Sequence, residues 1–190
     1  MTDASENLAP LQNANDVLRF WFDETPPVKW FEQDDEFDSC VRARGMTLYE
    51  QAADLKLAPW REDARSALAE VILLDQFPRN MFRGSPRTYA TDGLALMCAE
   101  YALGQGFDQA LLPMQRRFFY LPFQHSENTE DQARQAALFA ALDDAETYKW
   151  SLRHKEIVDR FGRFPHRNAV LGRETTSEEA AFLLEPNSSF

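Results

Sequence analysis

Apolar side chains recur at helical spacing along almost the whole of this chain. The clearest case is the segment from Arg61 to Phe77, in which Leu68, Val71 and Ile72 belong to one apolar stripe without an intervening glycine. This period places apolar groups on one side of an α-helix, where they pack against a neighbour. No segment longer than about five residues alternates as a half-buried strand would. The sequence therefore predicts an all-α fold, a multi-helix array or bundle of about seven to nine helices.

Capping residues and breakers place the other helices. The expected segments are Asp16–Phe22, a long helix from Asp34 to Leu55, Arg61–Phe77, Gly93–Leu103, Pro113–Leu121, Glu130–Leu142, Ala145–Phe161 and Ala180–Leu184. The expected caps are Asn13 or Asn15, Thr91 or Asp92, Asn128 or Thr129, and Thr176 in a capping box with Glu179. Gly45 lies inside the long helix, and glycine there weakens a helix by roughly 1 kcal/mol relative to alanine.

Length and composition indicate one globular domain. A chain of 190 residues with 44% apolar side chains can bury a core, so we expect a single helical domain over residues 13–190 after a disordered tail at residues 1–12. No apolar run is long enough for a membrane span, and the polar N-terminus is unlike a signal peptide. Two isolated cysteines, Cys40 and Cys98, suit a reducing compartment, so a cytoplasmic location is expected.

The charge of the chain narrows the range of partners. Its formal net charge is -11, whereas duplex nucleic acid is bound chiefly through neutralisation of phosphates, so no nucleic-acid partner is expected. Because the sequence has no apolar run of membrane-spanning length, no membrane partner is expected either. The segment from Arg153 to Arg173 is nevertheless basic. A small anionic or polar molecule, or a protein or peptide, is the expected partner, and the sequence does not indicate the oligomeric state.

Two stretches share the order aromatic, proline, arginine, asparagine: Phe77-Pro78-Arg79-Asn80 and, with a histidine inserted, Phe164-Pro165-His166-Arg167-Asn168. Each follows a predicted helix, and proline lacks an N–H and clashes with the preceding turn, so each stretch is expected to mark a helix exit. Polar side chains on such short connections could form a preformed pocket. Alternatively, they cap the helix end and complement its dipole. Both interpretations stay open.

A third motif completes a recognisable set. With Leu74–Asn80, Tyr120-Leu121-Pro122-Phe123-Gln124-His125-Ser126-Glu127 and Arg160–Asn168, the chain resembles the bacterial family known as domain of unknown function 924, from about Val17 to Leu184. The resemblance implies a tetratricopeptide-like, all-helical fold and implies no reaction. The family's motif residues correspond here to Asp75, Gln76, Arg79, Asn80, Tyr120, His125, Ser126, Glu127, Arg163, His166, Arg167, Asn168 and Arg173.

These residue types suit acid–base chemistry and anion binding. The candidate catalytic residues are His125 and His166, with Asp75 and Glu127 as carboxylates that orient them, because imidazole titrates near neutral pH. Arginine forks suit carboxylate or phosphate, and amides add neutral hydrogen bonds. The candidate ligand-binding residues are Gln76, Arg79, Asn80, Arg83, Tyr120, Ser126, Asp131, Arg163, Arg167, Asn168 and Arg173. Alternatively, the arginines pair with Asp75, Glu127, Asp131 and Asp159 in a structural network.

Other chemistries lack their signatures. There is no serine nucleophile elbow, no zinc-protease or deaminase motif and no glycine-rich phosphate loop, so no metal and no cofactor is expected. Two functions compete. The first is a preformed pocket for a small anionic or polar ligand, with Asp75, Arg79, His125 and His166 in one site. The second is a tetratricopeptide-like scaffold that binds a peptide or protein in a groove.

Overall fold

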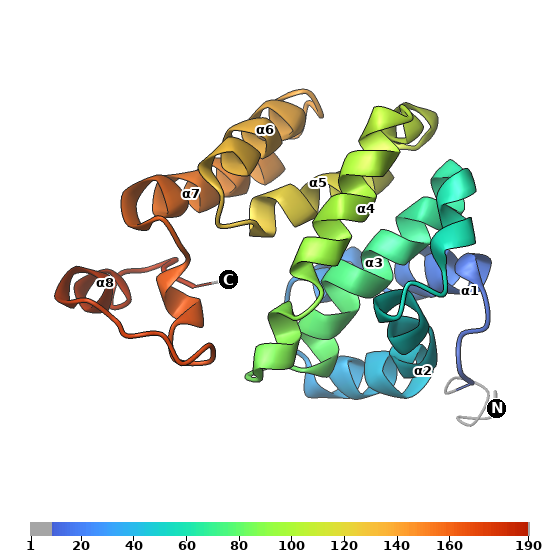
Figure 1. The fold of residues 1–190 in the computed structure, drawn as a ribbon, viewed down its shortest axis with the longest axis horizontal. Helices are drawn as coiled ribbons and strands as arrows, with labels where there is room; N and C mark the ends of the chain where they lie inside the picture. Colours follow the sequence, from blue (N-terminus) through green and yellow to red (C-terminus); the bar gives the residue numbers. More distant parts are fainter. Residues whose placement is uncertain (1–8, 190) are drawn as a thin grey trace. The chain divides into compact units, whose positions relative to one another are not determined.

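The computed structural model describes residues 9–189, and this part of the chain is all-helical (Figure 1). It contains eight α-helices and several single 3₁₀ turns, and none of its residues forms a strand. The predicted fold class is therefore confirmed. The tetratricopeptide-like arrangement stays a prediction. None of the described helices is both long and apolar enough to cross a membrane.

Local capping chemistry explains most helix boundaries. The helices are α1 (Ala14–Arg19), α2 (Asp35–Ala53), α3 (Ala64–Met81), α4 (Asp92–Gly104), α5 (Pro113–His125), α6 (Thr129–Ala140), α7 (Ala145–Phe161) and α8 (Ser177–Phe182). The side chains of Asn13, Asp34 and Asn128 accept hydrogen bonds from the first turns of α1, α2 and α6. Thr176 and Glu179 form the predicted capping box. The first helix ends differently from the prediction, in a π turn over Phe20–Glu24.

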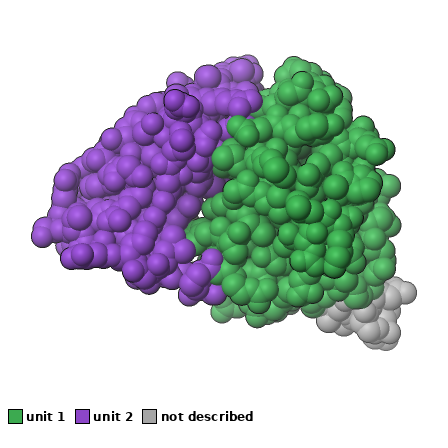
Figure 2. All heavy atoms as spheres, in the orientation of Figure 1, with its two compact units in different colours: residues 1–83, 87–122 green, residues 84–86, 123–190 purple. Residues whose placement is uncertain are grey.

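The chain divides into two compact units, shown in different colours in Figure 2. Unit 1 comprises residues 1–83 and 87–122, and unit 2 comprises residues 84–86 and 123–190. The expectation of one domain over residues 13–190 stays a prediction. The first eight residues of the predicted tail lie outside the described residues. Within residues 9–12, Leu11 is buried and its N–H donates to the carbonyl of Arg44.

Unit 1 is built around α3, which packs against α1, α2 and α4. Every residue of α3 from Ala67 to Pro78 is buried. The Phe77 ring meets Trp21 at 5.6 Å and Phe20 at 6.0 Å between ring centroids. On α2, Gly45 lets the same ring approach the backbone closely, because a Cβ at this position would lie only 2.3 Å from Phe77 Cε2.

The prediction that Pro78 marks a helix exit is wrong, since α3 continues through Pro78 to Met81. Proline removes the N–H that would bond the carbonyl four residues earlier, which is that of Leu74. The hydroxyl of Thr91 donates to this carbonyl at 2.6 Å and replaces the missing bond. Likewise α5 does not end at Pro122 but continues to His125. Gln132 then donates to the carbonyls of Gln124 and Ser126 at 2.8 and 2.7 Å.

Unit 2 has its own small core, centred on α7 and the segment that follows it. Ile157, Val158, Phe164 and Phe182 are buried together. Helices α6 and α7 pack side by side. Gly162 ends α7 in the left-handed conformation, with φ of 69°, and a 3₁₀ turn over Pro165–Arg167 follows. This turn carries the second aromatic-proline motif.

Candidate functional site

The predicted site residues fall into both units. Unit 1 holds Asp75, Gln76, Arg79, Asn80, Arg83 and Tyr120. Unit 2 holds His125, Ser126, Glu127, Asp131, Arg163, His166, Arg167, Asn168 and Arg173. Each group is described within its own unit, so a single site that joins Asp75 and Arg79 to His125 and His166 stays a prediction.

In unit 1, Arg79 lies between two carboxylates. Its guanidinium donates to both carboxylate oxygens of Asp92, at 2.9 and 3.2 Å, and to the Asp75 carbonyl at 2.5 Å. The Asp75 carboxylate lies 3.4 Å away and also accepts from the Gln76 amide at 2.6 Å. Burial alone would lower the pKa of Arg79, but the charges of Asp75 and Asp92 outweigh burial and raise it. Arg79 therefore ties the end of α3 to the start of α4.

The other polar candidates of unit 1 are also engaged. Asp38 accepts from Arg83 at 2.8 and 3.0 Å and from the Asn80 amide at 2.8 Å, which joins α2 to the end of α3. The Tyr120 hydroxyl donates to Asp108 at 2.7 Å. Burial first, and then the bond to Asp108, raise the pKa of Tyr120. The ion pairs of Arg79 and Arg83 with carboxylates on other helices fit the structural network that the sequence offered as the alternative to a ligand site.

In unit 2, two of the three histidines of the chain, His154 and His166, flank Phe164, and the third, His125, lies beside His154. The ring centroids of His154 and His166 both lie 5.7 Å from that of Phe164, and His125 lies 6.4 Å from His154. The Arg167 guanidinium stands 4.5 Å from the centroid of the Phe164 ring. We call His125, His154, His166, Phe164 and Arg167 the histidine cluster. Its members come from the end of α5, from α7 and from the 3₁₀ turn after α7.

His154 is the member that sequence reasoning missed. It is buried on α7, with Nδ1 at 2.9 Å from the Trp150 carbonyl and Nε2 at 3.4 Å from the Gln124 amide nitrogen. Because a carbonyl only accepts, Nδ1 carries the proton and Nε2 accepts from Gln124. Burial, opposed by the bond to Trp150 and assisted by nearby positive charge, lowers the pKa of His154 to about 3. His154 is therefore neutral near pH 7. Nothing in the local sequence marks it, because its partner Gln124 lies 30 residues away along the chain.

Glu127 fastens the segment that carries Phe164. Its carboxylate accepts from Arg173 at 2.7 and 3.0 Å and from the Phe164 N–H at 2.8 Å. Burial alone would raise the pKa of Glu127, but the bonds from Arg173 and Phe164 and the charge of Arg167 hold it below its ordinary value. Glu127 is thus an ionised anchor. Next to it, the Ser126 hydroxyl donates to Asp131 at 2.6 Å.

Arg163 and Asn168 both contact a second carboxylate, that of Glu179. Arg163 donates to both oxygens of Glu179, at 2.6 and 2.8 Å, and to the Glu174 carbonyl at 2.8 Å. The buried Asn168 amide lies 3.3 Å from Glu179. The bond from Arg163 is the main cause that lowers the pKa of Glu179 to about 2. A cavity of about 310 Å³ adjoins this pair, lined partly by Arg160 and Phe161.

The geometry limits the available chemistry. Four arginines each donate to both oxygens of one carboxylate: Arg79, Arg83, Arg163 and Arg173. Glu127, the partner of Arg173, was among the expected carboxylates, whereas Asp92, Asp38 and Glu179 were not. Among the described residues, no three His, Cys, Asp or Glu side chains are placed to bind a metal ion. His125 and His166 are half-buried, whereas Arg167 is buried. The histidine cluster thus combines accessible imidazoles with a buried guanidinium.

Over the described residues this is an all-helical protein in which the end of α5, α7 and the turn after α7 bring three histidines near the buried Phe164. The chain belongs to the family described as bacterial protein of unknown function (DUF924), whose model matches residues 17–187. It is also similar to the solved structure of the protein of unknown function ATU0120 from Agrobacterium tumefaciens. The identity is 45%, the TM-score is 0.87, and the match covers 90% of this chain and 96% of that one. None of the curated proteins matches this chain.

Proposed function

We propose that the histidine cluster binds a small anionic or polar molecule and that His125 or His166 transfers a proton to or from it. The observation that carries this proposal is that His154, His166 and Arg167 lie against the Phe164 ring, while the third histidine of the chain, His125, lies beside His154.

The roles within the cluster differ because the surroundings differ. Arg167 supplies a planar guanidinium held against the Phe164 ring, which suits a carboxylate or phosphate. His125 and His166 are half-buried and therefore reachable by a ligand. Imidazole ordinarily titrates near neutral pH, so these two side chains are the proton-transfer groups. His154 is neutral and buried, and it positions its neighbours rather than exchanging protons.

Two polar pairs lie next to the histidine cluster in the chain: Glu127 with Arg173, and Ser126 with Asp131. Glu127, fixed by Arg173, accepts the Phe164 N–H and so holds the ring and the following His166 in place. Ser126 is committed to Asp131 and is not proposed as a nucleophile. A rigid segment of this kind suits a preformed binding site.

The test combines ligand binding with one matched pair of variants. Arg167→Lys keeps the charge and loses the fork, so the affinity for inorganic phosphate or succinate should fall about tenfold. Arg160→Lys is the control, because Arg160 stands 4.6 Å from the Phe161 ring, in nearly the same geometry but outside the cluster. Thermal shift measures affinity. Imidazole NMR follows the three histidines individually, and the His125 and His166 signals should move when the anion is added.

Two results would overturn the proposal. One is a wild-type protein that gains no thermal stability from phosphate, succinate or related anions beyond that given by a neutral osmolyte. The other is an equal loss of affinity in Arg167→Lys and Arg160→Lys, which would mean that the anion responds to overall charge rather than to the cluster.

A further inference from the structure

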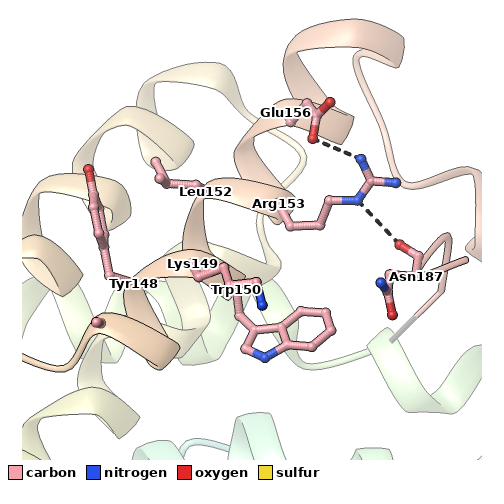
Figure 3. A pocket seen from close by; sticks show the side chains of 8 residues that line it. Tyr148, Lys149, Trp150, Leu152, Arg153, Glu156 and Asn187 are labelled. Atoms are coloured by element: carbon pink, nitrogen blue, oxygen red, sulfur yellow. Dashed lines mark hydrogen bonds and ion pairs between the residues drawn. The ribbon is translucent and has the colours of Figure 1, made fainter.

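An open cavity of about 550 Å³ lies on α7 in unit 2, and none of its lining residues is a histidine (Figure 3). Its walls come from α7, between Ala145 and Glu156, and from Asn187 near the end of the described chain. In Figure 3 the Trp150 indole and the Arg153 side chain both extend toward Asn187, whereas Tyr148 points away from them. None of the polar groups of the proposed anion site lines this cavity.

The cavity follows one face of the helix. Ala145, Tyr148, Leu152 and Glu156 succeed one another at intervals of three or four residues, which places them in a row along α7. At the α-helical rise per residue, the distance from Ala145 to Glu156 is about 17 Å. An extended peptide of about five residues has the same length. The shape therefore suits a strip of polypeptide better than a compact metabolite.

The strip exposes large apolar side chains. Trp150 is 37% exposed and Leu152 is 41% exposed. Tryptophan is enriched among the residues that contribute most to protein–protein binding, because it buries a large rigid surface at small entropic cost. Residues two positions apart do not share a helix face, and in Figure 3 these two side chains extend in different directions, so Trp150, beside Arg153, is the apolar anchor point offered to a partner.

The lining of the cavity carries two cationic side chains and one acidic side chain. Arg153 and Lys149 are cationic, and the one acidic residue of the lining, Glu156, accepts from Arg153 at 2.8 Å. Arg153 also donates to the Asn187 carbonyl at 3.3 Å, so its orientation is fixed (Figure 3). Lys149 has only a 3.7 Å contact with Glu146, and both side chains are about three-quarters exposed, at 74% and 73%. Such a solvated pair is weak and readily exchanged for another partner.

We propose that the face of α7 from Ala145 to Glu156 is a docking surface for a peptide segment that carries an acidic side chain beside an aromatic or leucine side chain. The acidic group pairs with Lys149 and Arg153, and the apolar group packs on Trp150. The occupant is chosen by charge complementarity, because a basic segment would place like charges against Lys149.

The experiment selects short random peptides displayed on phage with the full chain and measures the selected peptides by fluorescence anisotropy. Peptides that pair Asp or Glu with an aromatic or leucine residue should be enriched. Lys149→Glu should weaken their binding about tenfold, and Trp150→Ala at least about tenfold. The matched control is Lys155→Glu on the same helix, which changes the net charge equally, because Lys155 pairs with Asp159 outside the cavity.

Several outcomes would overturn this docking surface. Selection of basic or uncharged peptides would contradict the stated chemistry. An equal loss of peptide affinity in Lys149→Glu and Lys155→Glu would mean that binding depends only on net charge. Equal enrichment of the same peptides on wild type and on Trp150→Ala would mean that Trp150 is not the apolar anchor. A dimer in sedimentation velocity that Trp150→Ala abolishes would instead assign this face to a second copy of the chain.

Discussion

Replacing Gly45 by alanine tests how closely α2 and α3 pack. A Cβ at this position would lie 2.3 and 2.4 Å from two carbon atoms of the Phe77 ring and 3.1 Å from Met81 Cε. Ordinary carbon contacts are near 3.5–4.0 Å, so the ring must move by about 1 Å or the helices must separate. Phe77 is fully buried and bounded by Phe20 and Trp21, so the ring has little room to move.

The magnitude follows from two opposing effects. Alanine favours a helix over glycine by up to about 1 kcal/mol. Overpacking a well-filled core costs about 1–3 kcal/mol, occasionally more. The clash with a fixed ring places Gly45→Ala toward the upper part of that range, so the free energy of unfolding should fall by about 1–2 kcal/mol after the helix gain is subtracted.

Urea denaturation followed by tryptophan fluorescence measures the change. Gly93→Ala is the matched control, because Gly93 also lies in a helix and nothing stands within 4 Å of its added Cβ. That variant should be unchanged or more stable by up to about 1 kcal/mol. In addition, Gly45→Ala should cost less in a Phe77→Leu background, since leucine lacks the clashing ring atoms. A Gly45→Ala protein as stable as wild type would refute the close approach of these helices.

Two further predictions concern titratable side chains in unit 2. The folded pKa of His154 is about 3 against an ordinary 6.5, so as pH falls the unfolded chain takes up the proton first, and stability is lost from about pH 6.5 toward pH 3. Between pH 7 and pH 5 this loss should be roughly 2 kcal/mol in urea titrations, and a His154→Gln variant with the same slope would contradict it. Arg163→Ala should lower the urea midpoint and raise the pKa of Glu179 from about 2 toward its ordinary value of 4.5. An unchanged midpoint, with Glu179→Gln behaving identically, would show that this fork is not structural.

Local chemistry explains what could be predicted from the sequence. The caps at Asn13, Asn128 and Thr176 depend on hydrogen bonds to residues no more than three positions away, so the sequence alone indicates them. The apolar stripe of α3 likewise follows from the helical period of about 3.6 residues, which is visible in the sequence. The bounds of α7, Ala145–Phe161, agree with the prediction because Gly162 adopts the left-handed conformation that ends the helix.

Long-range partners explain what could not be predicted. Asp92 for Arg79, Asp38 for Arg83 and Glu179 for Arg163 lie 13, 45 and 16 residues away from the arginine in each pair. No local spacing distinguishes such a partner from the other carboxylates of an acidic chain. His154 was missed for a similar reason, since a histidine inside a helix shows its neighbours only after α5 and α7 are placed.

The two aromatic-proline motifs show why a repeated sequence does not imply a repeated local structure. Pro78 stays inside α3 because Thr91 supplies a hydrogen bond to the Leu74 carbonyl. Pro165, in contrast, begins a 3₁₀ turn after Gly162 has already ended α7. The first motif therefore places Arg79 where it joins two helices through Asp92, a contact that fixes packing. The second motif places His166 and Arg167 on a short turn beside two other histidines. A polar turn outside a helix can present side chains to a ligand, whereas a helix end bound to its neighbour cannot, so the search for chemistry in this family belongs first at the turn after α7.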